Sequence, residues 1–226
     1  MGTARVDCYK DDFFGGRSFS GTADANGWKV EDVSSAGNPT YACLDGEPTG
    51  SVQLGMDATS EAQSVALTHG DVLSFDIDSI QRVTYRAKVQ NVDAVTTVVL
   101  GVAGDHNATI DSIAQNAWFK IEGSGSTSSV VVETDDGSTD NDDVATGQTL
   151  ANSYKEMVID LSHGKSDVRF YIDNGNGQLR RVASTTTFDM SGYSGSLQPY
   201  MRVAKASGTG TPSVEVDLCE ISYKRN

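Results

Sequence analysis

Six carboxylates crowd one short segment of the sequence, at Glu133, Asp135, Asp136, Asp140, Asp142 and Asp143. Carboxylate oxygens are the ligands that Ca²⁺ takes in proteins. The spacing differs from an EF-hand loop, because Ala145 stands where that loop needs glycine and no glutamate closes it. A calcium site formed by Asp135, Asp136, Asp140 and Asp142 is one prediction, and a solvated acidic loop with no cofactor is the alternative.

A second group of acids lies near the end of the sequence, where Glu215, Asp217 and Glu220 have the spacing E-x-D-x-x-E. This spacing resembles the catalytic strand of jelly-roll β-glucanases, in which two glutamates flank a glycosidic bond. Glu215 and Asp217 share one face of a strand, and a bulge would bring Glu220 to the same face. The valines between them form an ordinary inward-facing set, and the following residues depart from the glucanase pattern. We predict a structural strand and no enzyme, with a divergent glycosidase built on Glu215 and Glu220 as an alternative.

No other pattern in the sequence points to catalysis. The three histidines stand beside glycine or aspartate, which predicts surface turns, and their spacing does not suit a metal pair. A phosphate loop, a nucleophile elbow and a Cys/His cluster are all missing from the sequence. Trp118 and Phe119 lie inside an alternating segment, which favours core packing over a platform for sugar rings.

Alternation of apolar and polar residues with period two is the main structural signal. It is clear at 82–89, where Val83 and Tyr85 alternate with basic residues, whereas 96–102 is almost entirely β-branched or apolar and predicts a strand covered on both faces. Further strands are predicted at 51–56, 64–68, 117–122, 129–134, 155–161, 167–172, 179–184, 198–205 and 213–223. Two long loops are predicted at 103–116 and 135–152.

Many short strands without an amphipathic helix predict an all-β fold, a two-sheet antiparallel jelly-roll sandwich. We expect one β-sandwich domain at 27–226. Residues 1–26 are rich in glycine, serine and aspartate, and we expect an N-terminal arm that orders only against a partner.

The charge balance excludes some partners. The formal net charge is −14, from 31 acidic and 17 basic residues, so the surface repels nucleic-acid phosphates. No segment approaches the ~20 apolar residues that a membrane span needs. Three widely spaced cysteines and a polar N-terminus favour a protein with free thiols, made in a cytoplasm.

Two sets of motifs resemble known families. The runs DVRFYID at 167–173, FDMS at 188–191, LQPY at 197–200 and VEVD at 214–217 resemble the C-terminal half of concanavalin-A-like jelly rolls. The runs AWFK at 117–120, ETDDG at 133–137 and ATG at 145–147 resemble a group of tailed-bacteriophage virion proteins, over about 50–223.

The second resemblance implies a head decoration or cement protein. Such a protein would bind the major capsid protein on the capsid exterior, as a homo-oligomer, and stabilise the shell of the virion after synthesis in the host cytoplasm. The alternative is a lectin-like domain, on a tail fibre or another recognition protein, that binds a glycan.

Overall fold

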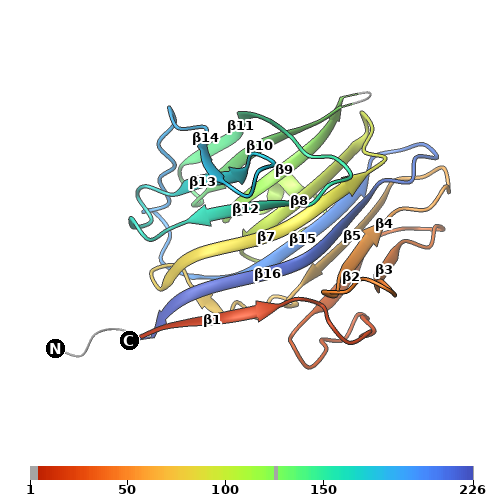
Figure 1. Ribbon diagram of the computed structural model, residues 1–226, viewed down its shortest axis with the longest axis horizontal. Coiled ribbons are helices and arrows are strands. Elements are labelled where there is room, and N and C mark those ends of the chain that lie inside the picture. The colour runs from red at the N-terminus through yellow and green to blue at the C-terminus, as the bar shows by residue number, and fades with distance from the viewer. Residues whose placement is uncertain (1–4, 125–126, 226) are drawn as a thin grey trace.

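A computed structural model describes residues 5–124 and 127–225 of the chain. Its strands form two antiparallel sheets that face each other (Figure 1). The prediction of an all-β, two-sheet antiparallel jelly-roll sandwich is therefore confirmed. The described residues contain no helix that could cross a membrane.

The first sheet, sheet A, holds the two longest strands in its middle. Its order is β14 (Leu179–Val182), β13 (Arg169–Asp173), β12 (Lys155–Asp160), β7 (Ile80–Gln90), β16 (Ser213–Arg225), β4 (Val52–Gly55) and β3 (Thr40–Cys43). One further strand, β1 (Arg5–Asp11), pairs with the C-terminal half of β16.

The second sheet, sheet B, faces sheet A across the hydrophobic core. Its order is β11 (Asp140–Thr149), β10 (Thr127–Asp135), β9 (Asn116–Ser124), β8 (Thr96–Ala103), β15 (Ser196–Lys205), β5 (Gln63–Thr68) and β2 (Lys29–Asp32). The short strand β6 (Phe75–Asp76) pairs with β15. Between β8 and β9, the chain makes one turn of 3-10 helix, η1 (Ile110–Ser112).

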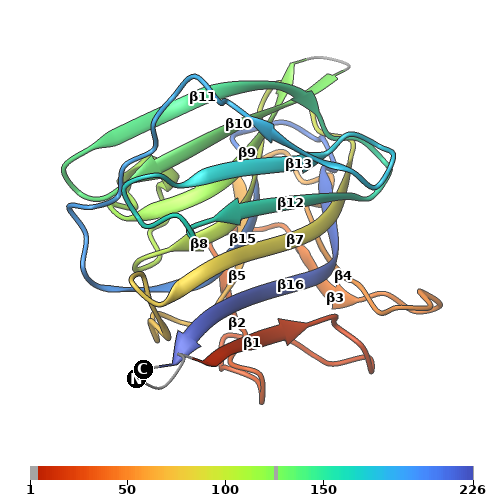
Figure 2. The ribbon, with the colours of Figure 1, turned by 60° about the vertical axis from the view of Figure 1, so that its left-hand side comes forward.

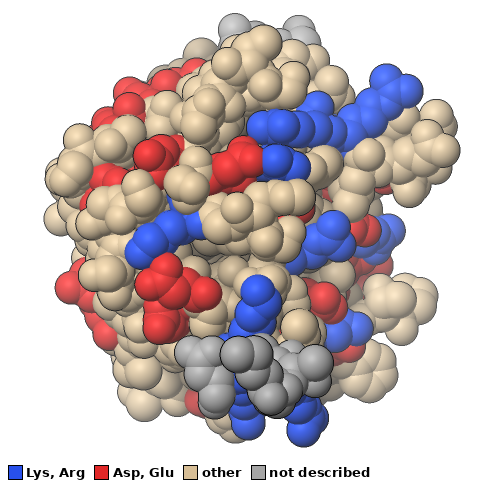
Figure 3. Space-filling model, turned by 90° about the vertical axis from the view of Figure 1, so that its left-hand side faces the viewer, with Lys and Arg blue, Asp and Glu red and all other residues tan. Residues whose placement is uncertain are grey.

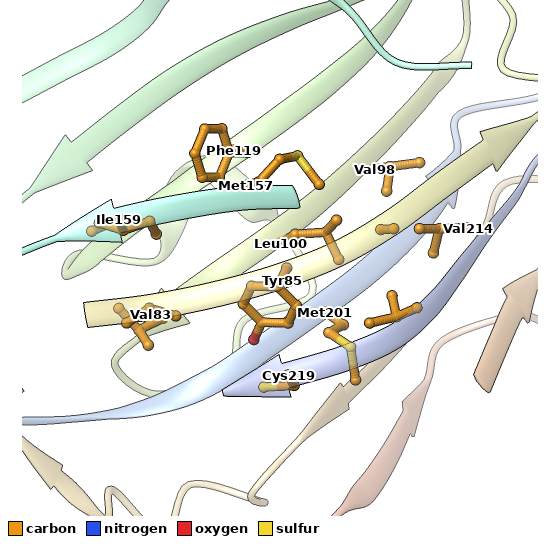
Figure 4. Close-up of a cluster of buried hydrophobic side chains, with 14 of the residues drawn as sticks. Val83, Tyr85, Val98, Leu100, Phe119, Met157, Ile159, Met201, Val214 and Cys219 are labelled. Carbon is orange, nitrogen blue, oxygen red and sulfur yellow. The ribbon is translucent and has the colours of Figure 1, made fainter. Parts of the chain in front are cut away.

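The core lies between the two sheets and is filled by the apolar half of each alternating strand (Figure 4). Tyr85 of β7 crosses this core, and its hydroxyl donates to the carbonyl of Gly101 in β8 at 2.8 Å. The bond satisfies a buried polar group and ties the two sheets together. As predicted, β8 is covered on both faces.

The described part of the N-terminal segment differs from the predicted arm. Strand β1 lies against β16 (Figure 2), and Phe13 and Trp28 are buried in the core. Asp11 is buried and accepts hydrogen bonds from Arg17 at 2.6 Å and from the Trp28 indole at 2.8 Å. These contacts make residues 5–26 part of the sandwich. A contact of this segment with a partner protein stays a prediction.

The predicted loop at 135–152 is also wrong in its middle, because residues 140–149 form β11 at the edge of sheet B. The burial of this strand is low throughout. An edge strand exposed to water can carry acidic side chains, and such charges discourage pairing with other chains.

Candidate functional site

The outer face of sheet B, turned away from the core, carries a row of aromatic and polar side chains. Strand register places Glu133 of β10 opposite Trp118 of β9, Trp118 opposite Gly101 of β8, and Gly101 opposite Tyr200 of β15. Opposed residues of antiparallel strands project from the same face. A Cβ atom at position 101 would lie 2.6 Å from the Cβ of Trp118, so glycine leaves the space that the Trp118 side chain needs.

The connection 104–115, called the cover loop below, lies over this row. Its Ile110 and Ile113 pack with Trp118 and Tyr200 in a small apolar cluster, separate from the main core. The His106 ring lies nearly parallel to the Tyr200 ring, and its Nδ1 is 2.9 Å from the Tyr200 hydroxyl. The loop therefore closes one half of the outer face of sheet B.

Arg202 of β15 fixes the middle of the cover loop. Its two terminal nitrogens donate to the carbonyls of Asn107 at 3.0 Å and Ala108 at 2.5 Å. The side chain is buried, yet its Nε has no hydrogen-bond partner among the described residues. Loop closure thus uses part of the guanidinium and leaves the buried Nε–H group without a protein partner.

Beside the cover loop, the outer face of sheet B is hollow. A cavity of about 290 Å³ opens between the loop, strands β5, β8 and β15, and the segment that follows β2. Its lining is mostly aliphatic, and its polar members are Gln63, Ser64, Thr97, Arg202 and Lys205. Val33 and Val95 stand at the rim with 47% and 39% of their surface exposed. A cavity of this size with a few polar groups suits a small ligand or one unit of a larger one.

Sequence reasoning did not identify Arg202. The register of β15 and β8 sets Arg202 opposite Val99, and Ala204 opposite Thr97. The alternation along β15 could have indicated that Arg202 and Ala204 face outward, but it could not show the cavity beneath a loop of another segment.

The four residues predicted to bind calcium do not form one ligand group in the described part of the chain, although Asp135 of β10 lies opposite Asp140 of β11. Asp136 is taken up by a turn, where its side chain accepts from the backbone N–H groups of Ser138, Thr139 and Gly192 at 2.7–2.8 Å. Asp135 accepts from the N–H of Gly137. Only Asp142 of the predicted set lies in a group that could hold a metal ion. Calcium binding itself stays a prediction.

That group joins Glu133, Asp142 and Asp143, and it already contains a cation. The Lys120 ammonium is buried and lies 2.6 Å from Asp143. Burial raises the pKa of Glu133 to about 7, although Lys120 opposes the rise. Asn116 donates to Glu133 at 3.1 Å. The group is a network of paired side chains around one lysine.

The E-x-D-x-x-E motif lies on the opposite side of the molecule, on the outer face of sheet A. A bulge, which the glucanase alternative would require, interrupts β16 between Val216 and Leu218. Glu215 is 2.7 Å from the ammonium of Lys88, and Asp217 pairs with Arg86. Both carboxylates are buried under these cations.

An aromatic side chain covers this pair of salt bridges. The Tyr154 ring lies 4.6 Å from the Arg86 Cζ and 4.7 Å from the Lys88 Nζ. Burial raises the pKa of Asp217, while Arg86 opposes the rise. Cations and an aromatic ring therefore occupy the space that a substrate would need above these carboxylates.

Other side chains differ in part from their predicted positions. Trp118 and Phe119 are buried as expected, although Trp118 packs under the cover loop and not between the sheets. His69 was expected in a surface turn, but it is buried beside Trp28 and Tyr9. Burial lowers the pKa of His69 to about 4. The neighbouring Gly70 and Asp71 supplied the turn signal, whereas the imidazole itself faces inward.

The two-sheet sandwich has the concanavalin-A-like jelly-roll fold that lectins and glucanases share. No protein-family model and no curated protein sequence matches this chain. Solved structures do match. Peanut lectin superposes with a TM-score of 0.62 at 10% identity, over 97% of this chain and 98% of the lectin.

Two other solved structures match over nearly the whole chain. SO2946 from Shewanella oneidensis, a protein of unknown function, has a TM-score of 0.62 at 16% identity, over 99% of this chain and 88% of that protein. SCLam, a non-specific endo-β-1,3(4)-glucanase of family GH16, has a TM-score of 0.59 at 12% identity, over 97% of this chain and 92% of the glucanase. At these identities, the comparisons establish the fold alone.

Proposed function

We propose that this protein binds carbohydrate in the cavity beside the cover loop. The observation that carries the proposal is the cavity itself, about 290 Å³ in volume, on the outer face of sheet B. Its aliphatic lining suits the C–H surface of a sugar ring, and Thr97, Ser64 and Arg202 offer hydrogen bonds to hydroxyl groups. The same fold in lectins and in glycoside hydrolases supports the proposal.

Binding without cleavage fits the acidic side chains better than hydrolysis. A glycosidase needs two carboxyl groups that flank the scissile bond. Glu215 and Asp217 are each paired with a cation, and Glu133 is buried beside the cover loop's cluster. We therefore propose a binding domain with no hydrolytic activity.

The test is a glycan array followed by calorimetry on the best ligand. Ala204→Trp fills the cavity from its floor without changing charge, and we expect it to weaken binding at least tenfold. Ala145→Trp on the exposed edge strand β11 makes the same substitution in the same sheet, and we expect unchanged affinity. Absence of any glycan ligand, or equal binding by the two variants, would contradict the proposal.

The capsid-decoration hypothesis stays a prediction. It rests on short sequence motifs, and no observation on the fold or the comparisons supports it over carbohydrate binding. The capsid partner, the homo-oligomer and the virion location belong to the same hypothesis. Mass spectrometry of purified virions is its direct test, and absence of this protein from intact particles would rule it out.

A further inference from the structure

The cavity differs in charge from the rest of the molecule. The chain carries 31 acidic and 17 basic residues, and acidic and basic side chains are interspersed on the face shown in Figure 3. Among the described residues, however, the cavity lining contains Arg202 and Lys205 and no aspartate or glutamate. In an acidic protein, such a lining favours an anion over a cation.

Arg202 is the charged group that the cavity can offer to a ligand. Lys205 has the opposite orientation on β15, and its ammonium donates to the carbonyls of Asp57, Thr59 and Gly210 at 2.6–3.2 Å. Arg202 faces outward with 6% of its surface exposed, and its Nε has no partner among the described residues. A buried arginine with a free donor gains from a charge-assisted hydrogen bond.

Two acids on the same face of the sheet as Arg202 are already paired with lysines. Glu31 faces the same side from β2, and its carboxylate lies 2.7 Å from the ammonium of Lys29. On the other side, Glu122 of β9 lies opposite Thr97 and 3.2 Å from Lys120. Neither carboxylate pairs with Arg202, so the guanidinium keeps its charge available for a ligand.

We infer that the cavity selects a carbohydrate that carries a carboxylate, as a hexuronic acid does, with the carboxylate on Arg202 and the sugar ring against the aliphatic wall. The inference rests on the proposed function and narrows its ligand class. The planar guanidinium matches the two oxygens of a carboxylate, and Val99, Ala204 and Ile110 supply the apolar surface for the ring. A single arginine fits one negative charge per sugar unit.

The sharpest test compares two ligands that differ only at their carboxyl groups. Calorimetry measures the affinity of the full chain for a trigalacturonate and for its methyl ester, which has the same ring skeleton and no charge. We expect the acid to bind at least tenfold more tightly than the ester, because one charge-assisted hydrogen bond is worth about that factor. Arg202→Met should reduce this ratio to about one.

A second pair of variants avoids disturbing the cover loop, since Arg202 also holds that loop in place. Ala204→Glu places a carboxylate in the cavity, and Ala204→Gln adds the same bulk without charge. We expect the glutamate variant to bind the acid about tenfold more weakly than the glutamine variant does. The ester should bind equally to both.

The outcomes separate this inference from the proposed function. Equal binding of acid and ester, abolished in both cases by Ala204→Trp, would overturn the carboxylate preference and leave carbohydrate binding standing. Preference for a sulfated galactose trisaccharide over the galacturonate would also overturn it. If cyclohexanecarboxylate binds as tightly as the trigalacturonate and depends equally on Arg202, the carboxylate preference stands and the carbohydrate proposal fails. No binding of any of these probes would remove both.

Discussion

Buried charged side chains on this protein divide into those that have a full set of partners and those that do not. The ammonium of Lys205 is bound by carbonyls, and that of Lys120 by carboxylates. Arg202, in contrast, has an Nε without a partner among the described residues. Glu133 has a pKa of about 7. Burying a charge is costly unless it is paired. Residues with incomplete pairing are therefore the best positions at which to test the structure.

Glu133 predicts a pH dependence of stability. Its pKa is about 7 in the folded protein against an ordinary value of 4.5, so between these pH values the folded state binds more protons than the unfolded state. Its contribution to the free energy of unfolding therefore falls as the pH rises from about 4.5 to 7. Glu133→Gln should raise the Tm by about 2–4 °C at pH 8, as ~1 kcal/mol does in a domain of this size, and leave it unchanged at pH 4.

The measurement is calorimetric melting of both proteins across this pH range. Glu122→Gln provides the control, because Glu122 lies on the neighbouring strand and is partly exposed. Its melting temperature should follow that of the wild type at every pH. An equal Tm of Glu133→Gln and the wild type at pH 8 would show that Glu133 ionises there at no cost.

The salt bridges of Glu215 and Asp217 predict the absence of glucanase activity. We expect no release of reducing sugar from β-glucans by the wild type, and the same result for Glu215→Gln. Lys88 lies 2.7 Å from Glu215 and Arg86 pairs with Asp217, so neither carboxylate is free to act on a glycosidic bond. Activity of the wild type that disappears in Glu215→Gln would contradict this prediction and make the protein an enzyme.

At the scale of elements, the N-terminal segment depends on Asp11. This carboxylate binds Arg17, Asn26, Trp28 and the backbone of Phe13. Phe13 has a φ of 55°, a left-handed conformation that is uncommon for a bulky residue and needs compensation. The bond to Asp11 and the burial of its ring supply that compensation, and so one polar residue holds several neighbours in place.

Asp11→Ala should destabilise the protein by about 3 kcal/mol, because it leaves the partly buried Arg17 without its main partner. Urea denaturation measures the change. Asp12→Ala is the matched control, since the Asp12 side chain accepts one long bond of 3.4 Å from Phe14, and we expect a loss below about 0.5 kcal/mol. Similar losses for the two variants would indicate that the N-terminal segment is held by β1 alone.

The cover loop is the second element that can be tested separately. Ile113 is buried against Trp118 and Tyr200 in a small apolar cluster, so Ile113→Ala should cost about 2 kcal/mol, at the low end for core truncations. It should also expose Trp118, which increased acrylamide quenching in a Trp28→Phe background would detect. Val72→Ala, at an exposed valine, should change neither quantity.

The sequence predicts the central strands well and the marginal ones poorly, for a physical reason. Strands such as β7 and β8 bury one or both faces, so apolar residues repeat along them with a clear period. Strand β11 is exposed at a sheet edge and has no apolar face. Strand β1 turns Tyr9 and the polar Asp11 inward, and therefore its sequence does not show a continuous apolar face.

The site is less predictable than the fold, because its parts come from three strands, the cover loop and segments that flank the strands. A glucanase-like arrangement of Glu215, Asp217 and Glu220 would need a bulge, and a bulge does lie on β16. The spacing could not indicate that Lys88 and Arg86 of another strand neutralise two of these acids. In the same way, the cavity around Arg202 depends on strand register and on the path of the cover loop, and neither is written in a local motif.

On the scale of the whole molecule, the net charge of −14 opposes the ligand that the cavity favours. A short uronate places its charge at Arg202 and feels mainly the local field. A long polyuronate must also lie along an acidic surface, whose repulsion extends about 30 Å at 10 mM salt and about 10 Å at 100 mM. The two lengths of ligand should therefore respond differently to salt.

We predict that the affinity for polygalacturonate, per binding site, rises several-fold when salt is raised from 10 to 100 mM, whereas trigalacturonate changes little or binds slightly more weakly. Basic proteins that bind polyanions behave in the opposite way, because salt screens their attraction. Calorimetry or fluorescence titration at the two salt concentrations measures both ligands. A polymer affinity that falls steeply with salt would mean that a basic surface elsewhere on the molecule, and not the single arginine in the cavity, holds the chain.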